Sequence, residues 1–236
     1  MSEENIFREV DEELRSERMR ALWRRIAPFV IGAAIAIVAL VAVNEGWSWY
    51  TNSQAARSSE ELYASLEVGD DLAAAQARLD QLAADGSGGY PVLAEFRKAS
   101  LLAEAGDTAG AVAAYDALAN SQSNVRLREL ALLQAAQILV DTGTLGDVEA
   151  RIGTIASDDN PMRRVARELI GLAQYKAGDA AAAQASFEAV LNDPLVQGPM
   201  RNRMAYYLAQ LLSEGAISAE SAESAPQTEE AAPAAE

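Results

Sequence analysis

The chain has 236 residues, half of them hydrophobic, and a formal net charge of −16. This charge disfavours a nucleic-acid role, because phosphate backbones are bound by basic surfaces. Histidine and cysteine are both absent, which excludes Ser-His and Cys-His catalysis and the usual zinc and iron–sulfur sites. Carboxylate chemistry remains open, but no Asp or Glu stands out. We therefore expect no enzyme, no cofactor and no small-molecule substrate, and the alanine- and leucine-rich composition predicts an all-α protein.

A charged leader, residues 1–25, opens the chain and is predicted to be cytoplasmic and partly helical. Its apolar residues Phe7, Val10 and Leu14 recur at helical spacing, so it could dock on a cytosolic partner, although a solvated helix is the simpler interpretation. Residues 26–43 then carry no charge and no strongly polar side chain. As a helix they would cover about 27 Å, close to the hydrocarbon thickness of a bilayer. We predict one uncleaved transmembrane helix in contact with lipid, since a signal peptide has a shorter apolar run.

Residues around this span fit a membrane anchor. Pro28 lies in the first turn of the apolar run, and Gly32 and Ala36 could pack on another transmembrane helix or face lipid. The aromatic residues expected at the two membrane interfaces are Trp23, Trp47, Trp49 and Tyr50. The basic residues that precede the span are Arg20, Arg24 and Arg25, whereas the first one after it is Arg57. The positive-inside rule therefore predicts a cytoplasmic N-terminus and, in a bacterium, a periplasmic C-terminal domain.

Residues 44–215 are predicted to form a row of helix pairs, because glycines recur 35 to 37 residues apart. Each glycine is expected to supply the left-handed residue that ends a helix; these are Gly69, Gly106, Gly143, Gly178 and Gly215. Five residues beyond them come the packing positions Ala74, Ala111, Val148 and Ala183, and nine beyond come the bulky residues Tyr115, Ile152 and Phe187. Small residues also lie seven before, at Ala99, Ala136 and Gly171. The first repeat fits worst, because Arg78 stands where a bulky apolar residue is expected.

The expected helices run over about 22–67, 70–84, 91–105, 108–120, 124–142, 145–156, 161–177, 180–192 and 199–214. A period near 36 residues with Gly-Asp, alanine and an aromatic residue resembles the tetratricopeptide repeat, in a degenerate form. The alternative is an unrelated helical bundle with chance glycines. The acidic tail, residues 216–236, has no core-forming residues and is predicted to be disordered.

Most basic residues after the span are predicted to lie on the first helices of the repeats, which line the concave face of such a stack. We hypothesise that they form a basic stripe that binds acidic segments of a protein partner, or the acidic tail itself. The alternative is ordinary solvated charge. These residues are Arg97, Lys98, Arg126, Arg128, Arg163, Arg164, Arg167, Lys176, Arg201 and Arg203.

An anchor that ends in Gly46-Trp47-x-x-Tyr50, followed by Ala55-Ala56-Arg57-Ser58, Leu62-Tyr63 and degenerate repeats, resembles the ancillary SecYEG translocon subunit family. The stretch 169–190 is similar too, and residues 6–13 resemble alphaproteobacterial relatives. The resemblance implies an inner-membrane protein whose periplasmic repeats contact translocon subunits, periplasmic chaperones or exported chains. A structural scaffold for cell-envelope assembly or cell division is the alternative.

Overall fold

The computed structural model describes residues 3–67 and 71–217, with side chains from residue 23 onward. Within these residues the chain is all-α, as predicted, with nine helices and no strand. It divides into two compact units, Met1–Glu60 and Glu61–Glu236. The compact repeat unit therefore begins at Glu61, and residues 44–60 of the expected repeat domain belong to the first unit. The prediction that the tail from residue 216 has no core-forming residue is wrong at Ile217, which packs against the hydrophobic core of α8 (Ala180–Leu191) and α9 (Gly198–Ser213). From position 218 the acidic tail lies outside the described residues.

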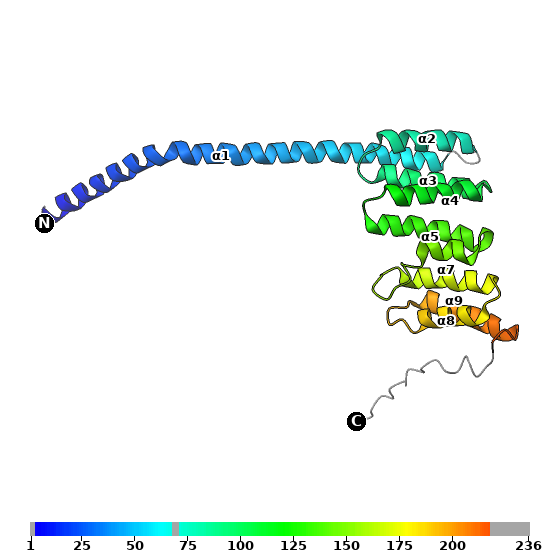
Figure 1. The fold of residues 1–236 in the computed structure, drawn as a ribbon. Coiled ribbons are helices and arrows are strands. Elements are labelled where there is room, and N and C mark those ends of the chain that lie inside the picture. The colour runs from blue at the N-terminus through cyan, green and yellow to red at the C-terminus, as the bar shows by residue number, and fades with distance from the viewer. Residues whose placement is uncertain (1–2, 68–70, 218–236) are drawn as a thin grey trace, which may run out of the picture. The chain divides into compact units, whose positions relative to one another are not determined.

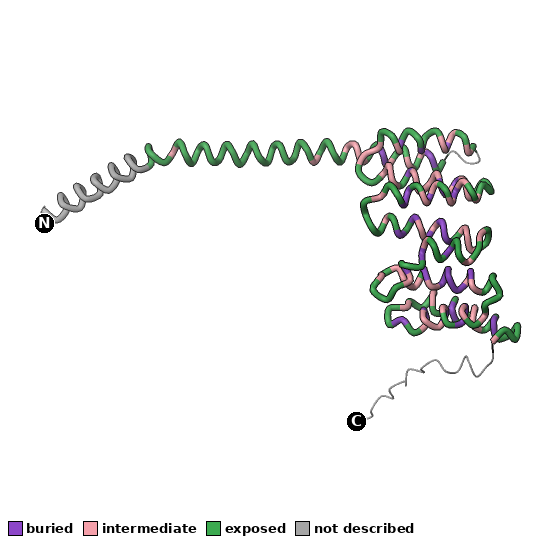
Figure 2. Tube along the Cα trace, in the orientation of Figure 1, coloured by how far each residue is buried: buried purple, intermediate pink, exposed green. Residues whose placement is uncertain are grey.

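Helix α1 runs from Glu3 to Leu66 and contains the predicted membrane span (Figure 1). It is the one helix, among the described residues, that is long and apolar enough to cross a membrane, and the side chains of the span are exposed on nearly all sides (Figure 2). The helix starts well before the expected position 22, so Pro28 lies inside a continuous helix and not in a first turn. A proline there removes the amide that would bond to the Arg24 carbonyl, because its nitrogen carries no hydrogen. Two predictions fall outside the described side chains, which begin at residue 23: the apolar face of the leader that includes Phe7, and the role of Arg20.

The repeat unit is a stack of antiparallel helices (Figure 1). These helices are α2 (Leu72–Asp85), α3 (Tyr90–Glu104), α4 (Thr108–Ser121), α5 (Val125–Thr142), α6 (Leu145–Ile152), α7 (Arg163–Lys176), α8 (Ala180–Leu191) and α9 (Gly198–Ser213). Each packs on its neighbour in sequence, and α5 also packs on α7. The first helices of successive pairs are α3, α5, α7 and α9, and the second helices are α2, α4, α6 and α8. Most boundaries match the prediction within two residues, although α6 ends at Ile152 in place of 156, where the chain tightens into turns.

In each helix pair, a capping side chain at the start of the second helix sets the register of that helix. Asp71, Asp107, Thr144 and Asp179 each accept a hydrogen bond from the backbone N–H three residues later. Four residues after each cap lies a buried residue of small or moderate size, and eight after it lies a buried large one. The pairs are Ala75 with Leu79, Ala111 with Tyr115, Val148 with Ile152, and Ala183 with Phe187. The predicted packing residues Ala111, Tyr115, Ala183 and Phe187 are all among these buried residues.

In the first repeat, the buried packing positions lie one residue later than predicted from the sequence. Its cap is Asp71, so Ala75 and Leu79 are buried, and Ala74 and Arg78 are not. Counting from glycine was wrong here because the packing face follows the first helical turn, which the cap defines.

The repeat glycines serve two different purposes. Gly106, Gly178 and Gly215 have positive φ angles of 85°, 84° and 69°, and the residue after each donates to a carbonyl five positions back, as in a Schellman motif. The same prediction for Gly143 is wrong, because its backbone is extended (φ −107°). A Cβ at Gly143 would lie 2.8 Å from Leu139 Cδ2, so this position needs a small residue and not a left-handed one. Gly69 lies outside the described residues.

Close packing between the helices of a pair depends on small residues. The small residues Ala99, Ala136 and Gly171 are all buried. A Cβ added to Gly171 would lie only 2.6 Å from Phe187 Cε1. The ring of Phe187 therefore rests directly on the backbone of α7, and this contact fixes the spacing of α7 and α8.

Candidate functional site

Two cavities on the first helices of the repeat unit adjoin one another. One, of about 350 Å³, is lined by the side chain of Arg97 and by apolar side chains from the end of α1 and from α3: Leu62, Leu66, Leu93 and Phe96. The other, of about 410 Å³, lies between α3, α4 and α5 and has a more polar lining. Ser100, Tyr115 and Gln134 line both cavities. We call the continuous depression the α3–α5 groove.

A hydrogen-bonded network joins the two halves of the groove, because Arg97 lines the apolar cavity and Glu104 lines the polar one. Arg97 Nη1 lies 2.6 Å from Glu104 Oε1, and Ser100 Oγ donates to the same oxygen at 3.0 Å. The hydrogen bond from Arg97 holds the pKa of Glu104 below its usual value. Tyr115 packs its ring 6.1 Å from that of Phe96, and burial raises the pKa of its phenol. The network keeps Glu104 ionised on the solvent-exposed side of the groove.

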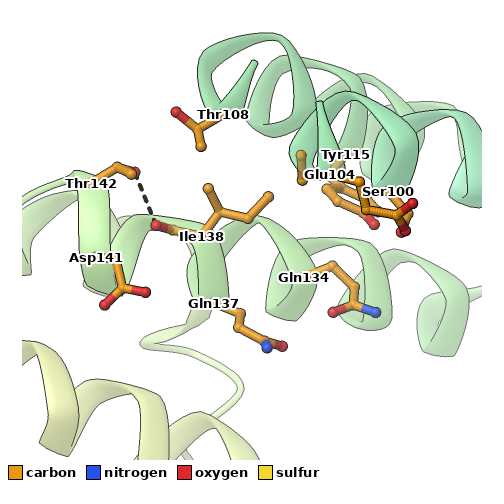
Figure 3. Close-up of a pocket in the computed structure, with 10 residues that line it drawn as sticks. Ser100, Glu104, Thr108, Tyr115, Gln134, Gln137, Ile138, Asp141 and Thr142 are labelled. Carbon is orange, nitrogen blue, oxygen red and sulfur yellow. Dashed lines mark hydrogen bonds between the residues drawn. The ribbon is translucent and has the colours of Figure 1, made fainter. Parts of the chain in front are cut away.

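The polar half of the groove is lined by amide and carboxylate side chains. Gln134 and Gln137 lie one turn apart on α5, and both line the cavity (Figure 3). Each amide group offers donors and an acceptor. The carboxylate of Asp141 lines the same half and makes no hydrogen bond within the described part of the chain. Among the described residues no group of three acidic side chains could hold a metal ion.

An exposed apolar row crosses the first helices. Leu93, Leu130 and Val165 occupy the same position in successive repeats, six residues before the buried small residue, and are 48%, 39% and 40% exposed. Leu93 lines the α3–α5 groove, whereas Val165 lines a separate cavity between α7 and α9. Sequence reasoning missed this row, although the spacing of the three residues follows the repeat period.

The predicted basic residues are held in local pairs. Seven of the ten form ion pairs: Arg97, Lys98, Arg126, Arg163, Arg164, Arg167 and Arg203. Arg128 and Lys176 donate to the carbonyls of Gln122 and Asp141, and Arg201 makes no hydrogen bond or ion pair with the described residues. Several partners lie about one repeat away, as in Arg203 with Glu168, 35 residues apart. A role of these ten residues in binding a partner stays a prediction.

Asp193 is the most deeply buried of the acidic partners, with its side chain 2% exposed. It accepts from Arg163 Nε at 2.6 Å, from Arg164 Nη1 at 3.2 Å and from the Leu195 amide. Burial alone would raise the pKa of Asp193, but the Leu195 amide and the two guanidinium groups outweigh it and lower the pKa. This cluster ties the α8–α9 loop to α7. Nothing in the sequence marked Asp193 apart from its place before a proline.

A family model described as a tetratricopeptide repeat-like domain matches residues 20–213. The match includes the apolar stretch of α1 and all of the helix pairs. Comparison with the curated proteins finds no match, and neither does comparison with the solved structures. The prediction of tetratricopeptide-like repeats is therefore confirmed. Repeats of this kind form a protein-interaction fold, because stacked helix pairs expose an extended concave surface.

Proposed function

This chain belongs to the tetratricopeptide repeat-like domain family, and from that premise we propose that it is a membrane-anchored protein that binds other polypeptides through the α3–α5 groove. The exposed apolar side chains of Leu66 and Leu93, in a cavity that adjoins a polar one, carry the proposal. A surface of this kind buries apolar side chains of a partner and also satisfies its backbone hydrogen bonds.

The anchor in this proposal is the apolar stretch of α1. Its side chains are exposed, and such a surface is stable when lipid covers it. Trp23 on one side and Trp47, Trp49 and Tyr50 on the other would lie at the two interfaces. Apart from the backbone of its own helix, nothing lies within 4 Å of a Cβ placed on Gly32, which leaves the Gly32–Ala36 face open to lipid or to another helix.

We further propose that the repeats face the periplasm of a bacterium and that the protein is an accessory subunit of the SecYEG translocon, in contact with exported chains or periplasmic chaperones. Arg20, Arg24 and Arg25 support the orientation. The proposal of SecYEG as the partner is supported by a resemblance to the ancillary translocon subunits. This resemblance covers the anchor with its Gly46-Trp47-x-x-Tyr50 ending and residues 169–190.

A crosslinking experiment tests the groove and the partner together. A photoreactive phenylalanine at Gln137, inside the groove, is compared with one at Glu149, which is exposed on the second helix α6. We expect position 137 to capture SecYEG subunits, exported chains or periplasmic chaperones in cells. Capture of division or cell-wall synthesis proteins would favour the scaffold alternative. Equal capture at both positions would contradict binding in the groove.

Labelling of single cysteines tests the orientation without background, because the chain contains no cysteine. Ser123→Cys is exposed between α4 and α5, and Ser16→Cys lies in the leader. A membrane-impermeant maleimide should label position 123 in spheroplasts and position 16 only after lysis. The reverse pattern would overturn the periplasmic assignment.

A further inference from the structure

The two halves of the α3–α5 groove differ in chemistry. Leu62, Leu66, Leu93 and Phe96 line one half, and of these Leu66 and Leu93 remain substantially exposed. Burial of a large side chain against them would remove apolar surface from water on both partners. This half therefore favours a leucine, phenylalanine or similar side chain of a ligand.

The other half is acidic. Its lining includes the carboxylates of Glu104 and Asp141 and no basic side chain. Arg97 lines the apolar half and balances the charge of Glu104 through two hydrogen bonds. Lys176 donates to the backbone carbonyl of Asp141, so the Asp141 carboxylate has no cationic partner among the described residues. The chain as a whole carries a net charge of −16. A basic side chain of a ligand is therefore favoured here, both by the local carboxylates and by the field of the whole protein.

Helix geometry sets the distance between these two halves. Phe96 and Glu104 lie eight residues apart on α3, which corresponds to about 12 Å along the helix axis. An extended polypeptide covers that distance in about four residues. Gln134 and Gln137 lie alongside, where their amide groups can pair with the backbone of such a segment.

We propose that the α3–α5 groove binds an extended polypeptide segment that carries a large apolar side chain and, about four residues away, a lysine or arginine. The inference rests on the proposed function and adds the chemistry of the segment that is bound. The apolar residue occupies the Leu93–Phe96 half, and the basic residue pairs with Asp141. Asp141 lies 37 residues after Glu104, which is one repeat period, and so occupies on α5 the position that Glu104 occupies on α3.

Labelled peptides test the charge preference on the full chain in detergent. One fluorescein-labelled peptide of about ten residues has leucine and arginine four positions apart in a serine–glycine frame, and its twin has glutamate in place of arginine. Fluorescence anisotropy should show about tenfold tighter binding of the arginine peptide at low salt. The ratio should shrink as salt is added, because screening weakens exposed charge pairs.

Matched variants place the binding in the groove. Leu93→Asp should weaken the arginine peptide about tenfold, and Asp141→Asn should reduce the ratio between the two peptides about threefold. Leu195→Asp and Asp85→Asn make the same changes at exposed positions outside the groove and should leave both affinities unchanged. Circular dichroism checks that each variant keeps its helix content.

Equal or tighter binding of the glutamate peptide overturns this proposal, as does binding that survives Leu93→Asp, or no binding of either peptide. The proposed function fails separately, when position 137 captures no polypeptide in cells. Capture in cells together with indifference to the charge of the peptide would retain the function and reject the ligand chemistry.

Discussion

The α3–α5 groove and the α7–α9 end of the repeat unit follow the same repeat plan but differ in how their charges are held. In the groove, the Arg97–Glu104 pair is open to water, with side chains 32% and 55% exposed. At the α7–α9 end, Asp193 and Glu168 are 2% and 9% exposed, and each is held by arginine. One region therefore holds charges that a ligand can reach, and the other uses its charges to join neighbouring repeats.

The energetics of the two kinds of pair explain this division. An exposed pair contributes little to stability, because water solvates both charges almost as well. A buried carboxylate that loses its partner is destabilising, because it stays desolvated with nothing to compensate. Ligand binding can therefore rearrange the groove at a small cost in stability, whereas the α7–α9 end has to remain intact.

The largest effect should come from the core of the α7–α9 end. Phe187 is 1% exposed and packs on Gly171. Phe187→Ala should lower the free energy of unfolding by about 4 kcal/mol, since the cavity cannot close completely. Chemical unfolding of the full chain in detergent, followed by circular dichroism, measures this. The exposed Leu195→Ala is the control and should stay within about 0.5 kcal/mol of the parent; similar losses in both variants would contradict the assignment of Phe187 to the core.

Asp193→Asn should be the next most destabilising change, by about 3 kcal/mol, because two arginines lose their buried carboxylate. The pKa of Asp193 is lowered in the folded protein, so its contribution is complete above the unfolded value of about 3.9 and is lost as the pH falls through the folded pKa. The parent should therefore lose stability below about pH 4 more steeply than the variant. Asp85→Asn on the exposed face of α2 should leave the pH profile unchanged. Parallel pH profiles for the parent and the Asp193 variant would show that this pKa is not lowered.

Arg203 offers a direct test of the idea that the α7–α9 end depends on its buried ion pairs. Arg203→Gln removes two hydrogen bonds at 2.8 Å and leaves the buried Glu168 without its partner. We expect a loss of about 2 kcal/mol in unfolding experiments. The double change with Glu168→Gln should recover part of it, because no buried charge is then left unpaired. A double variant that is less stable than Arg203→Gln alone would argue against this account.

The same glycine turn ends a first helix in both regions, so the same substitution should change stability equally in both. Gly106 and Gly178 end first helices in the two regions with almost equal φ angles and open space around the Cβ position. Alanine at either position should cost about 1 kcal/mol, because the left-handed conformation strains a residue with a Cβ. Asparagine at the same positions should cost less, since it tolerates this conformation better. Unequal effects of the two alanine variants would show that tertiary packing, and not backbone strain, controls these turns.

Local features made most of the fold predictable. The helices, the repeat period and three of the glycine turns follow from capping residues and from small residues that lie near one another in sequence. The first repeat was misaligned because Asp70 and Asp71 are both able to cap, and only the packing of Leu79 distinguishes them. Gly143 was misassigned because the sequence does not distinguish a glycine needed for its φ angle from one needed for its size.

The candidate site was less predictable, because its residues come together from distant segments. The end of α1, α3 and α5 jointly line the groove, and the partners that hold the basic residues lie up to 35 residues away. The basic residues were therefore noticed without the carboxylates that engage them. The apolar row of Leu93, Leu130 and Val165 left a periodic signal, but each residue alone resembles an ordinary helix residue.

The smallest change in stability should have the clearest effect on binding. Arg97→Gln removes the partially exposed pair with Glu104, and we expect a loss of no more than about 0.5 kcal/mol. Since Glu104 then lacks its cation, the groove becomes more acidic, and affinity for the arginine peptide should rise about threefold while the glutamate peptide binds more weakly. Anisotropy titrations and unfolding curves on the same preparation measure both quantities. A large loss of stability with no gain in affinity would show that the groove, like the α7–α9 end, uses its ion pair to hold the helices together.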